Sequence, residues 1–300
     1  MKDFTDWGIK TRKFPEYNYN AVWTNLKTLR LGKGQASPLP ADKSEFYDVA
    51  INTKCNLQCP FCYTDAKRLG INFPNIVEKA QFFFEQMEDN DKPFQIAIGS
   101  SGEPTIHPEF TNFLEAIYNL NIVPNYTSNG ISIANEDKES EKILEATAKY
   151  VGGVALSANT WNSAIDLVWR KAFKKLVDFG NTNLNIHYII KDKSSVDEFI
   201  NIYNEFKDNT LYFVLLPLMN SGRSKERYSE DVFEYLLNSG LNFERIAFGA
   251  HFYDLLRKQN KLKCWLYPPE AFSKNLILGD TIKITPSSFD LTPLMEIKYG

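Results

Sequence analysis

Short apolar runs alternate with amphipathic segments between residues 46 and 240 of this 300-residue chain. In the amphipathic segments, apolar residues recur every three to four positions, which places them on one face of a helix. The strand-like runs that precede these helices are 47–51, 95–98, 123–127, 154–156, 184–190 and 211–216. This alternation predicts an α/β fold with a parallel sheet and right-handed crossovers. An eight-unit barrel takes about 250 residues, so six units in fewer residues predict a partial, TIM-like (β/α)6 barrel.

The two ends of the chain lack this alternation. Residues 1–45 contain scattered aromatic residues and are expected to form an irregular N-terminal cap. Beyond residue 240, the pattern indicates a further strand at 245–248, a short helix at 251–259 and a hairpin that turns at Gly279-Asp280. We therefore expect three domains, which are the cap (1–45), the core barrel (46–240) and a small α+β C-terminal extension (241–300).

Composition narrows the possible partners and compartment. Hydrophobic residues make up 43% of the chain and charged residues 24%, and the net charge is −3, as in ordinary globular proteins. The absence of a long basic run argues against a nucleic-acid partner. No apolar run is long enough for a membrane span, and the polar first residues do not resemble a secretory signal. We expect a reducing, cytoplasmic location, where clustered cysteines bind metals or act in redox chemistry.

Three of the four cysteines lie directly after the first predicted strand, with the spacing C-x3-C-x2-C: Cys55, Cys59 and Cys62. A structural zinc site needs four ligands, and His107 and Cys264 are both far away in the sequence. A single catalytic cysteine would not explain three, and the Asn, Gln and Pro between them suit a loop better than a buried core. Iron–sulfur clusters are normally held by four cysteine thiolates, so three would leave one iron free.

This motif, with the aromatic Phe61 directly before the third cysteine, resembles the signature of the radical S-adenosylmethionine (radical SAM) superfamily. In that family the three cysteines bind a [4Fe-4S] cluster, whose free iron is chelated by S-adenosylmethionine. One electron cleaves the sulfonium and yields a 5′-deoxyadenosyl radical. The resemblance implies a partial (β/α)6 barrel, in which Phe61 shields the cluster and borders the adenine. It also implies an external one-electron reductant, such as a flavodoxin- or ferredoxin-like protein, and an unidentified substrate that loses a hydrogen atom.

A second segment, Gly102-Glu103-Pro104, follows the second predicted strand and resembles the G-E-P segment of the same family. Ser101 stands where the family usually has a first glycine. The resemblance implies that Gly102 and Glu103 lie beside the amino group of the cofactor. An ammonium group needs acceptors, and glycine allows backbone carbonyls to come close. An ordinary strand-to-helix turn is the alternative interpretation.

Further polar residues follow the third, fourth and fifth strands. Ser128 and Asn129 resemble part of a T-N-G segment of the family, and Ser157 stands where the family places contacts to the cofactor's carboxylate or ribose. A simple turn would also explain the first pair. Asn185 and His187 share one face of the fifth strand and would meet substrate if that face points inward. The motifs share the C-terminal ends of the predicted strands, where parallel α/β barrels build active sites.

The C-terminal region resembles a SPASM or twitch extension that lacks its auxiliary cluster. Cys264 is the only cysteine there, and Ser287 stands where a ligand cysteine would be. Arg223, after the sixth strand, is expected to be a solvated loop residue. The competing function is a non-catalytic iron–sulfur electron carrier or sensor, which would need a fourth ligand and would not need Gly102 and Glu103.

Overall fold

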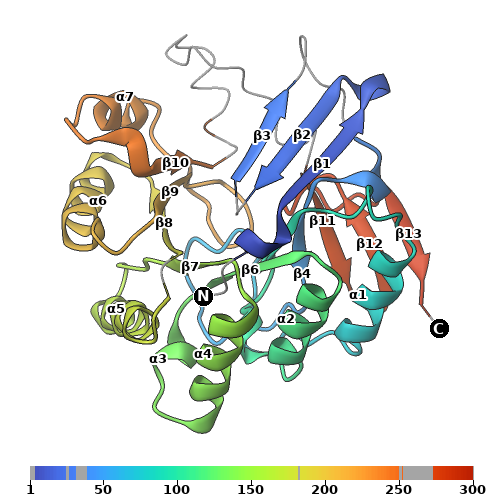
Figure 1. Cartoon of the computed structure of the whole chain (residues 1–300). Coiled ribbons are helices and arrows are strands. Elements are labelled where there is room, and N and C mark those ends of the chain that lie inside the picture. The colour runs from blue at the N-terminus through green and yellow to red at the C-terminus, as the bar shows by residue number, and fades with distance from the viewer. Residues whose placement is uncertain are drawn as a thin grey trace.

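A ten-stranded sheet forms the body of the protein (Figure 1). The computed structural model describes residues 4–24, 27–31, 39–181, 183–249, 252 and 273–299. Eight parallel strands are β4 (Phe46–Ala50), β5 (Gln95–Ile98), β6 (Val123–Ser128), β7 (Gly153–Ser157), β8 (Leu184–Ile190), β9 (Tyr212–Pro217), β10 (Ile246–Phe248) and β11 (Ser273–Leu278). The six predicted barrel strands are confirmed as β4 to β9, and β10 confirms the further strand.

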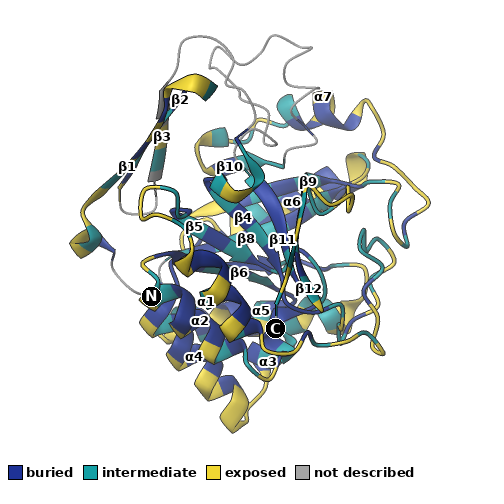
Figure 2. Ribbon diagram, turned by 90° about the vertical axis from the view of Figure 1, so that its right-hand side faces the viewer, coloured by how far each residue is buried: buried dark blue, intermediate teal, exposed yellow. Residues whose placement is uncertain are grey.

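Helices follow these strands and cover the outer face of the sheet (Figures 1 and 2). They are α1 (Ile76–Glu85), α2 (Phe110–Asn119), α3 (Ile131–Ala134), α4 (Lys138–Tyr150), α5 (Ser163–Asp178), α6 (Lys193–Phe206) and α7 (Val232–Leu237). The sequence did not predict the one-turn helix α3. Polar residues fix several N-termini, since the side chains of Asp137, Asn162 and Asp192 accept hydrogen bonds from the first turns of α4, α5 and α6.

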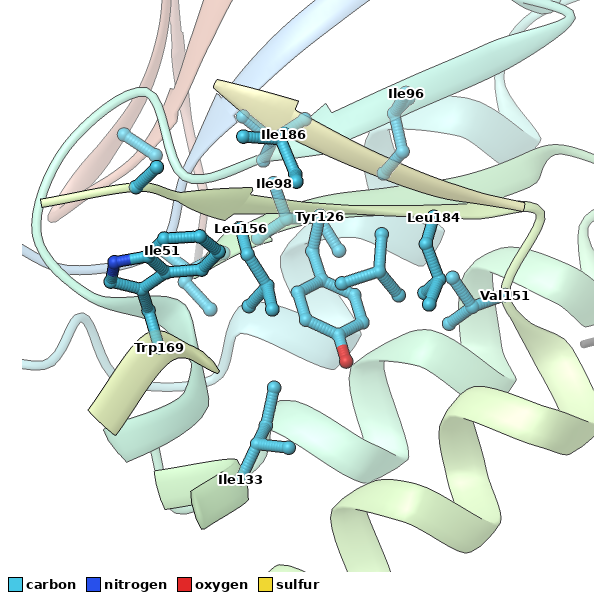
Figure 3. Packing of buried hydrophobic residues seen from close by; sticks show 14 of the residues in the cluster. Ile51, Ile96, Ile98, Tyr126, Ile133, Val151, Leu156, Trp169, Leu184 and Ile186 are labelled. Atoms are coloured by element: carbon cyan, nitrogen blue, oxygen red, sulfur yellow. The ribbon is translucent and has the colours of Figure 1, made fainter. Parts of the chain in front are cut away.

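The main core lies between the outer face of the sheet and the helices (Figure 3). Ile98, Tyr126 and Leu156, from three neighbouring strands, are each at most 1% exposed and belong to the same buried cluster as Trp169 of α5. Because side chains alternate across a strand, residues between these apolar ones face inward. The inner face of the sheet is therefore free to line a cavity.

The N-terminal segment differs from the expectation of an irregular cap. It forms a separate antiparallel sheet of β1 (Ile9–Phe14), β2 (Tyr19–Thr24) and β3 (Lys27–Leu31). Trp23 of β2 is fully buried and stacks on Phe94, directly before β5. Arg12, 2% exposed, donates hydrogen bonds to four backbone carbonyls of the barrel side, those of Lys43, Ser44, Asn90 and Asp91. These contacts attach the small sheet to the barrel.

The predicted C-terminal hairpin is confirmed as β11 and β12 (Thr281–Thr285), followed by β13 (Met295–Lys298). Strand β11 pairs in parallel with β4, so the first barrel strand is not an edge of the sheet. Lys79 of α1 anchors the hairpin turn, because its ammonium group donates to Gly279 O at 2.6 Å. The predicted helix at 251–259 and Cys264 lie outside the described residues. The domain boundaries stay a prediction, and within the described ranges no helix is long and apolar enough to cross a membrane.

Candidate active site

A cavity of about 980 Å³ opens at the C-terminal ends of the parallel strands. It lies at the upper end of the range of about 300–1,000 Å³ that is typical of small-molecule sites. All nine residues predicted to bind the metal or the cofactor line it, and they come from the ends of four strands. They are Cys55, Cys59, Phe61 and Cys62 after β4, Gly102 and Glu103 after β5, Ser128 and Asn129 at the end of β6, and Ser157 at the end of β7. We call these strand ends and loops the rim.

The deeper wall of the cavity consists of strand residues whose side chains point inward, and we call it the floor. Its members are Asp48, Ala97, Thr127, His187 and Leu216. The strand pairing shows that these side chains share the inner face of the sheet, because Asp48 lies opposite Ala97, and His187 lies opposite Ser157 of the rim. The rim therefore surrounds the opening, and the floor closes the cavity inside the barrel.

The cysteine loop is folded by its own backbone, and hydrogen-bond donors lie near its sulfur atoms. Cys55 N donates to Lys67 O at 2.9 Å, which closes the base of the loop. Leu57 N lies 3.4 Å from the Sγ atom of Cys55, and the hydroxyl of Thr64 lies 3.5 Å from that of Cys62. Donors beside sulfur suit thiolate ligands, because they stabilise the negative charge.

Burial controls the protonation of two of these thiols. It raises the pKa of Cys55 to about 12 and that of Cys59 to about 11. The metal-free thiols are therefore protonated at neutral pH. Metal ions bind thiolates, so binding at this loop must release protons.

The three cysteines suit a multi-iron cluster better than a single ion. In the described part of the chain, no three His, Cys, Asp or Glu side chains converge where they could hold one metal ion. A structural zinc site would need four such ligands around one point. In a cluster, each thiolate binds its own iron atom, so the sulfur atoms stand further apart. The cysteine set therefore fits a cluster, and within the described residues nothing completes a zinc site.

Arg223 braces the cysteine loop, although the sequence suggested a solvated residue. Its Nε donates to Cys59 O at 2.9 Å, and its Nη1 donates to Asp65 Oδ1 at 3.0 Å and Ala66 O at 2.8 Å. Its backbone N–H donates to Cys62 O at 2.9 Å. One residue from the loop after β9 thus holds four points of the loop after β4, three through its side chain and one through its backbone.

The two residues before Arg223 approach the same loop. Gly222 has φ +59°, and a Cβ atom there would lie 2.3 Å from Cys62 O, so only glycine fits. The hydroxyl of Ser221 donates to Tyr63 O at 3.2 Å. The loop after β9 therefore packs directly against the cysteine loop across the barrel opening.

Glu103 ties two parts of the rim together. It is 3% exposed, and its carboxylate accepts from Thr105 N at 3.2 Å, Thr105 Oγ1 at 2.7 Å, Ser128 Oγ at 2.8 Å and Asn129 N at 2.8 Å. Burial raises the pKa of Glu103, while these donors oppose the rise. The carboxylate oxygens, which the sequence placed at the cofactor's amino group, are thus largely used within the protein.

The backbone beside Glu103 is shaped for close contact. Gly102 has φ +69°, and a Cβ atom there would lie 2.1 Å from Asn52 Oδ1 and 2.7 Å from Lys54 O. No other residue fits this position without displacing its neighbours. Ser100 lies two residues earlier, and its buried hydroxyl has no hydrogen-bond partner in the described structure. The Tyr63 hydroxyl donates to Ser100 O at 2.8 Å and so links this turn to the cysteine loop.

Some of the remaining predicted residues are hydrogen-bonded within the protein, and one is not. Ser128 belongs to the Glu103 network. Asn129 donates through Nδ2 to Asn56 Oδ1 at 2.8 Å, and the same nitrogen lies 3.9 Å from the Sγ atom of Cys55. The Ser157 hydroxyl faces the cavity and makes no hydrogen bond with the described residues. Ser157 is thus available to a ligand, whereas Ser128 and Asn129 shape the rim.

Two titratable side chains belong to the floor, and only His187 was singled out from the sequence. It lines the cavity, and burial lowers its pKa to about 4, so it is neutral. Asn185 shares its strand face but does not line the cavity. Asp48 was missed, although Tyr47 and Val49 on either side are fully buried on the outer face, which directs Asp48 inward. Burial raises the pKa of Asp48 to about 6.

The C-terminal segment completes one wall of the cavity. Ser288 and Phe289 line it, and the ring of Phe289 stacks on Tyr63 with centroids 4.5 Å apart. Ser287, at the predicted place of a missing ligand cysteine, accepts hydrogen bonds from the backbone N–H groups of Phe289 and Asp290. Its side chain therefore forms a turn that brings Phe289 to the cysteine loop.

Comparisons with known proteins agree with this geometry. A sequence model of the radical SAM superfamily matches residues 49–226. SuiB of Streptococcus suis bound to S-adenosylmethionine gives a TM-score of 0.63 at 18% identity, over 82% of this chain and 60% of SuiB. SuiB bound to the precursor peptide SuiA gives 0.62 at 18% identity, over 83% and 60%. The chain thus spans about 60% of the length of SuiB, and the likeness shows a shared fold. No curated protein matches the chain significantly.

The match to the superfamily covers more than half of the chain, from β4 to the loop after β9. It includes the cysteine loop, the Gly102-Glu103 turn and Arg223. A non-catalytic electron carrier, the alternative function suggested by the sequence, is therefore set aside. The chain belongs to the radical SAM superfamily, whose members are enzymes that use a [4Fe-4S] cluster and S-adenosylmethionine.

Proposed function

We propose that Cys55, Cys59 and Cys62 hold the [4Fe-4S] cluster, and that the enzyme removes a hydrogen atom from a substrate bound in the barrel. One observation carries this proposal: all nine predicted metal- and cofactor-binding residues line a single cavity at the C-terminal ends of the parallel strands. That edge is where parallel α/β barrels build their active sites.

When bound, the cluster and S-adenosylmethionine supply one-electron cleavage of the sulfonium and abstraction of a hydrogen atom. The protein supplies orientation and excludes water. Phe61 packs partly buried against the main core and lines the cavity between two of the cysteines, so we propose that it shields the cluster and borders the adenine. The stack of Tyr63 on Phe289 closes the adjoining wall.

We assign the seating of S-adenosylmethionine to the groups of the rim that the protein leaves unused. The unpartnered Ser100 hydroxyl, the Ser157 hydroxyl and the backbone at Gly102 can bind its polar groups. Glu103 and Asn129 act one step away, because their hydrogen bonds fix the loops that present those groups. Pre-organised loops of this kind reduce the free energy lost on ordering the site.

The substrate is proposed to lie on the floor of the cavity, below the cofactor. The cavity volume is at the upper end of the range for single small-molecule sites, which allows room beside the cofactor. A small metabolite or a peptide side chain would fit this space. SuiB has been crystallised with a precursor peptide, which makes peptides a natural first set of candidates.

An external one-electron donor is required, and we propose a flavodoxin- or ferredoxin-like protein. Cys55, Cys59 and Cys62 are each partly exposed, so a donor can approach the loop that carries them. Leu69, which is 96% exposed, and Ile71, which is 58% exposed, lie just beyond this loop and could contact such a donor.

The decisive experiment is anaerobic reconstitution with iron and sulfide. The expected result is a brown protein with about four irons per chain, whose reduced EPR signal changes when S-adenosylmethionine is added. Dithionite should then release 5′-deoxyadenosine and methionine. The Cys59→Ser variant should lose both the bound cluster and the cleavage of S-adenosylmethionine. Ser239→Ala, on the loop after α7, should keep both. A colourless protein, or a cluster that ignores S-adenosylmethionine, would contradict the proposal.

One experiment can identify the substrate and show that its hydrogen atom is transferred to 5′-deoxyadenosine. Reconstituted enzyme would be incubated with deuterated candidate peptides or metabolites, and deuterium would be sought in 5′-deoxyadenosine by mass spectrometry. Transfer of deuterium identifies the substrate and the position that is attacked.

A further inference from the structure

The floor of the cavity contains a carboxylate that the protein does not pair. Asp48 lies in the middle of β4, beside Ala97 of β5, and lines the cavity. It makes no hydrogen bond or ion pair with the described residues. The nearby Tyr63 hydroxyl donates to Ser100 O instead. Asp48 is half-buried, and an enclosed carboxylate without a donor is costly, so such a group calls for a ligand or a proton.

The other carboxylates that line the cavity are accounted for. Glu103 accepts four hydrogen bonds from the rim. Glu198 is exposed and accepts from the Tyr188 hydroxyl at 2.7 Å. Glu226 is exposed at the edge of the cavity. Asp48 is thus the only lining carboxylate of the described residues that is both enclosed and unpaired.

Among the described residues that line the cavity, no cationic side chain pairs with Asp48. Arg223 is engaged with Asp65 and with backbone carbonyls of the cysteine loop. Lys191 and Lys225 line the cavity but are exposed. His187, the other titratable residue of the floor, is neutral because burial lowers its pKa to about 4. The negative charge of the floor is therefore unopposed by the described side chains.

A second unpaired acceptor lies next to Asp48. Asn275 of β11 is its partner in the parallel register, so both side chains stand on the same face of the sheet. Asn275 donates through Nδ2 to Thr285 Oγ1 at 3.0 Å, and that hydroxyl donates to Ser287 O at 2.9 Å. This relay fixes the amide orientation and leaves the buried Oδ1 without a donor. Within the described residues, two acceptors on neighbouring strands thus lack donors, and of these Asp48 lines the cavity.

We infer that Asp48 is a subsite for a cationic group of the substrate, an ammonium or a guanidinium, and that the buried amide oxygen of Asn275 beside it adds to the negative potential there. This inference rests on the proposed function, because it places a substrate in the barrel below the cofactor. Such a group offers several N–H donors and a positive charge, which are the properties that the floor lacks. Ala97 and Leu216 would contact the apolar part of the same molecule.

The test uses the reconstituted holoenzyme saturated with S-adenosylmethionine. Isothermal titration calorimetry would compare n-pentylammonium with 1-pentanol, which has a similar shape but no charge. Wild-type protein should bind the ammonium at least about tenfold more tightly, a difference of about 1.4 kcal/mol. Asp48→Asn should remove this preference and leave pentanol binding unchanged. The matched control Glu198→Gln alters an exposed carboxylate of the same cavity and should keep the preference.

Several results would overturn the inference. Equal binding of the two probes to wild-type protein would do so, as would a preference that survives in Asp48→Asn. If Asp48→Asn weakened S-adenosylmethionine binding as strongly as ammonium binding, Asp48 would belong to the cofactor site. Asp48→Ser provides a second variant if the first does not fold.

The same experiment separates this inference from the proposed function. Intact cleavage of S-adenosylmethionine without any preference for the ammonium would defeat the subsite alone. Failure of cleavage in a protein that holds its cluster would instead defeat the proposed function, whatever the titration shows.

Discussion

The carboxylate of the rim and the carboxylate of the floor of one cavity differ in their hydrogen bonding. On the rim, Glu103 and Asn129 are bonded to other parts of the protein, and Arg223 braces the rim from the loop after β9. On the floor, the side chains of Asp48 and His187 have no described partner. Burial raises the pKa of Asp48 and lowers that of His187, so it favours the neutral form of each. The rim is thus built before any ligand arrives, whereas the floor is completed by what binds there. This division suits an enzyme whose cofactor is constant and whose substrate defines its specificity.

The largest loss of stability should come from breaking the hydrogen bonds that Glu103 accepts on the rim. Glu103→Gln places an NH2 group among four donors, so at least one hydrogen bond becomes a clash. We expect a loss of about 3 kcal/mol in the free energy of unfolding, measured by urea denaturation, and weaker binding of S-adenosylmethionine. The control Glu145→Gln changes an exposed carboxylate of α4 and should have no effect. Unchanged stability of Glu103→Gln would show that the rim is not held by this carboxylate.

Replacing the carboxylate of the floor should change the free energy of unfolding in the opposite direction. The pKa of Asp48 in the folded protein, about 6, lies above its ordinary value of 3.8, so the native state holds the proton more tightly and stability falls as pH rises from about 4 to 6. Asp48→Asn should therefore stabilise the protein by about 1–3 kcal/mol at pH 7.5, after allowance for screening by water in the cavity. The gain should vanish near pH 4.

The measurement is urea unfolding of both proteins at several pH values. His187 contributes the opposite slope, because its lowered pKa makes stability fall as pH drops from 6.5 toward 4. Only the difference between variant and wild type isolates Asp48. Asp208→Asn, on an exposed loop, is the control and should give no pH-dependent difference. A destabilised Asp48→Asn protein would mean that the floor already pairs this carboxylate.

A smaller effect is expected where the rim is braced from across the barrel. Arg223→Lys keeps a positive charge near Asp65 but cannot reach all three of its side-chain acceptors. We expect a loss of about 1–2 kcal/mol in stability and a broadened or shifted EPR signal of the reduced cluster. Arg227→Lys, an exposed position nearby, should leave that signal unchanged. If both variants matched wild type, the brace would have no role in positioning the cluster.

The smallest effect concerns the junction between rim and C-terminal segment. Phe289→Leu removes the ring stack on Tyr63 and should cost about 0.5–1.5 kcal/mol. It should also speed the loss of the reduced cluster in air, because the wall beside the cysteine loop is opened. The exposed Leu291→Ala provides the comparison, and equal oxygen sensitivity of the two variants would remove this role from the stack.

Local patterns in the sequence predicted the barrel and the rim well. The strands from β4 to β9 were found because apolar runs and helical periods alternate regularly, and the cysteine spacing marked the loop after β4. Strands β1–β3 were missed because their alternation is broken: Ile9 is 71% exposed and Leu29 is 60% exposed, while Arg12 is buried. From the sequence alone, an arginine in a strand is predicted to lie at the surface. The four carbonyl partners that allow Arg12 to be buried are distant in the sequence.

Pairings between distant segments could not be predicted. Nothing near 273–278 indicates that this strand pairs with β4, and the roles of Asn275 and Phe289 depend on that pairing. The brace by Arg223 has the same origin, since its acceptors lie about 160 positions earlier in the chain. The inward position of Asp48 could have been predicted from the sequence. Side chains alternate along a strand, and the apolar Tyr47 and Val49 on either side are fully buried on the outer face.

The pairing of β11 with β4 has a consequence for the order of events during synthesis. Ser273 pairs with Phe46, so the strand that leads into the cysteine loop acquires its neighbour only after 227 more residues have been made. At about 5–20 residues per second, this interval lasts roughly 10–45 s on the ribosome. Throughout that time the first barrel strand has one edge without its final partner. Until the C-terminal hairpin has been made, the strand that leads into the cysteine loop can pair only with β5.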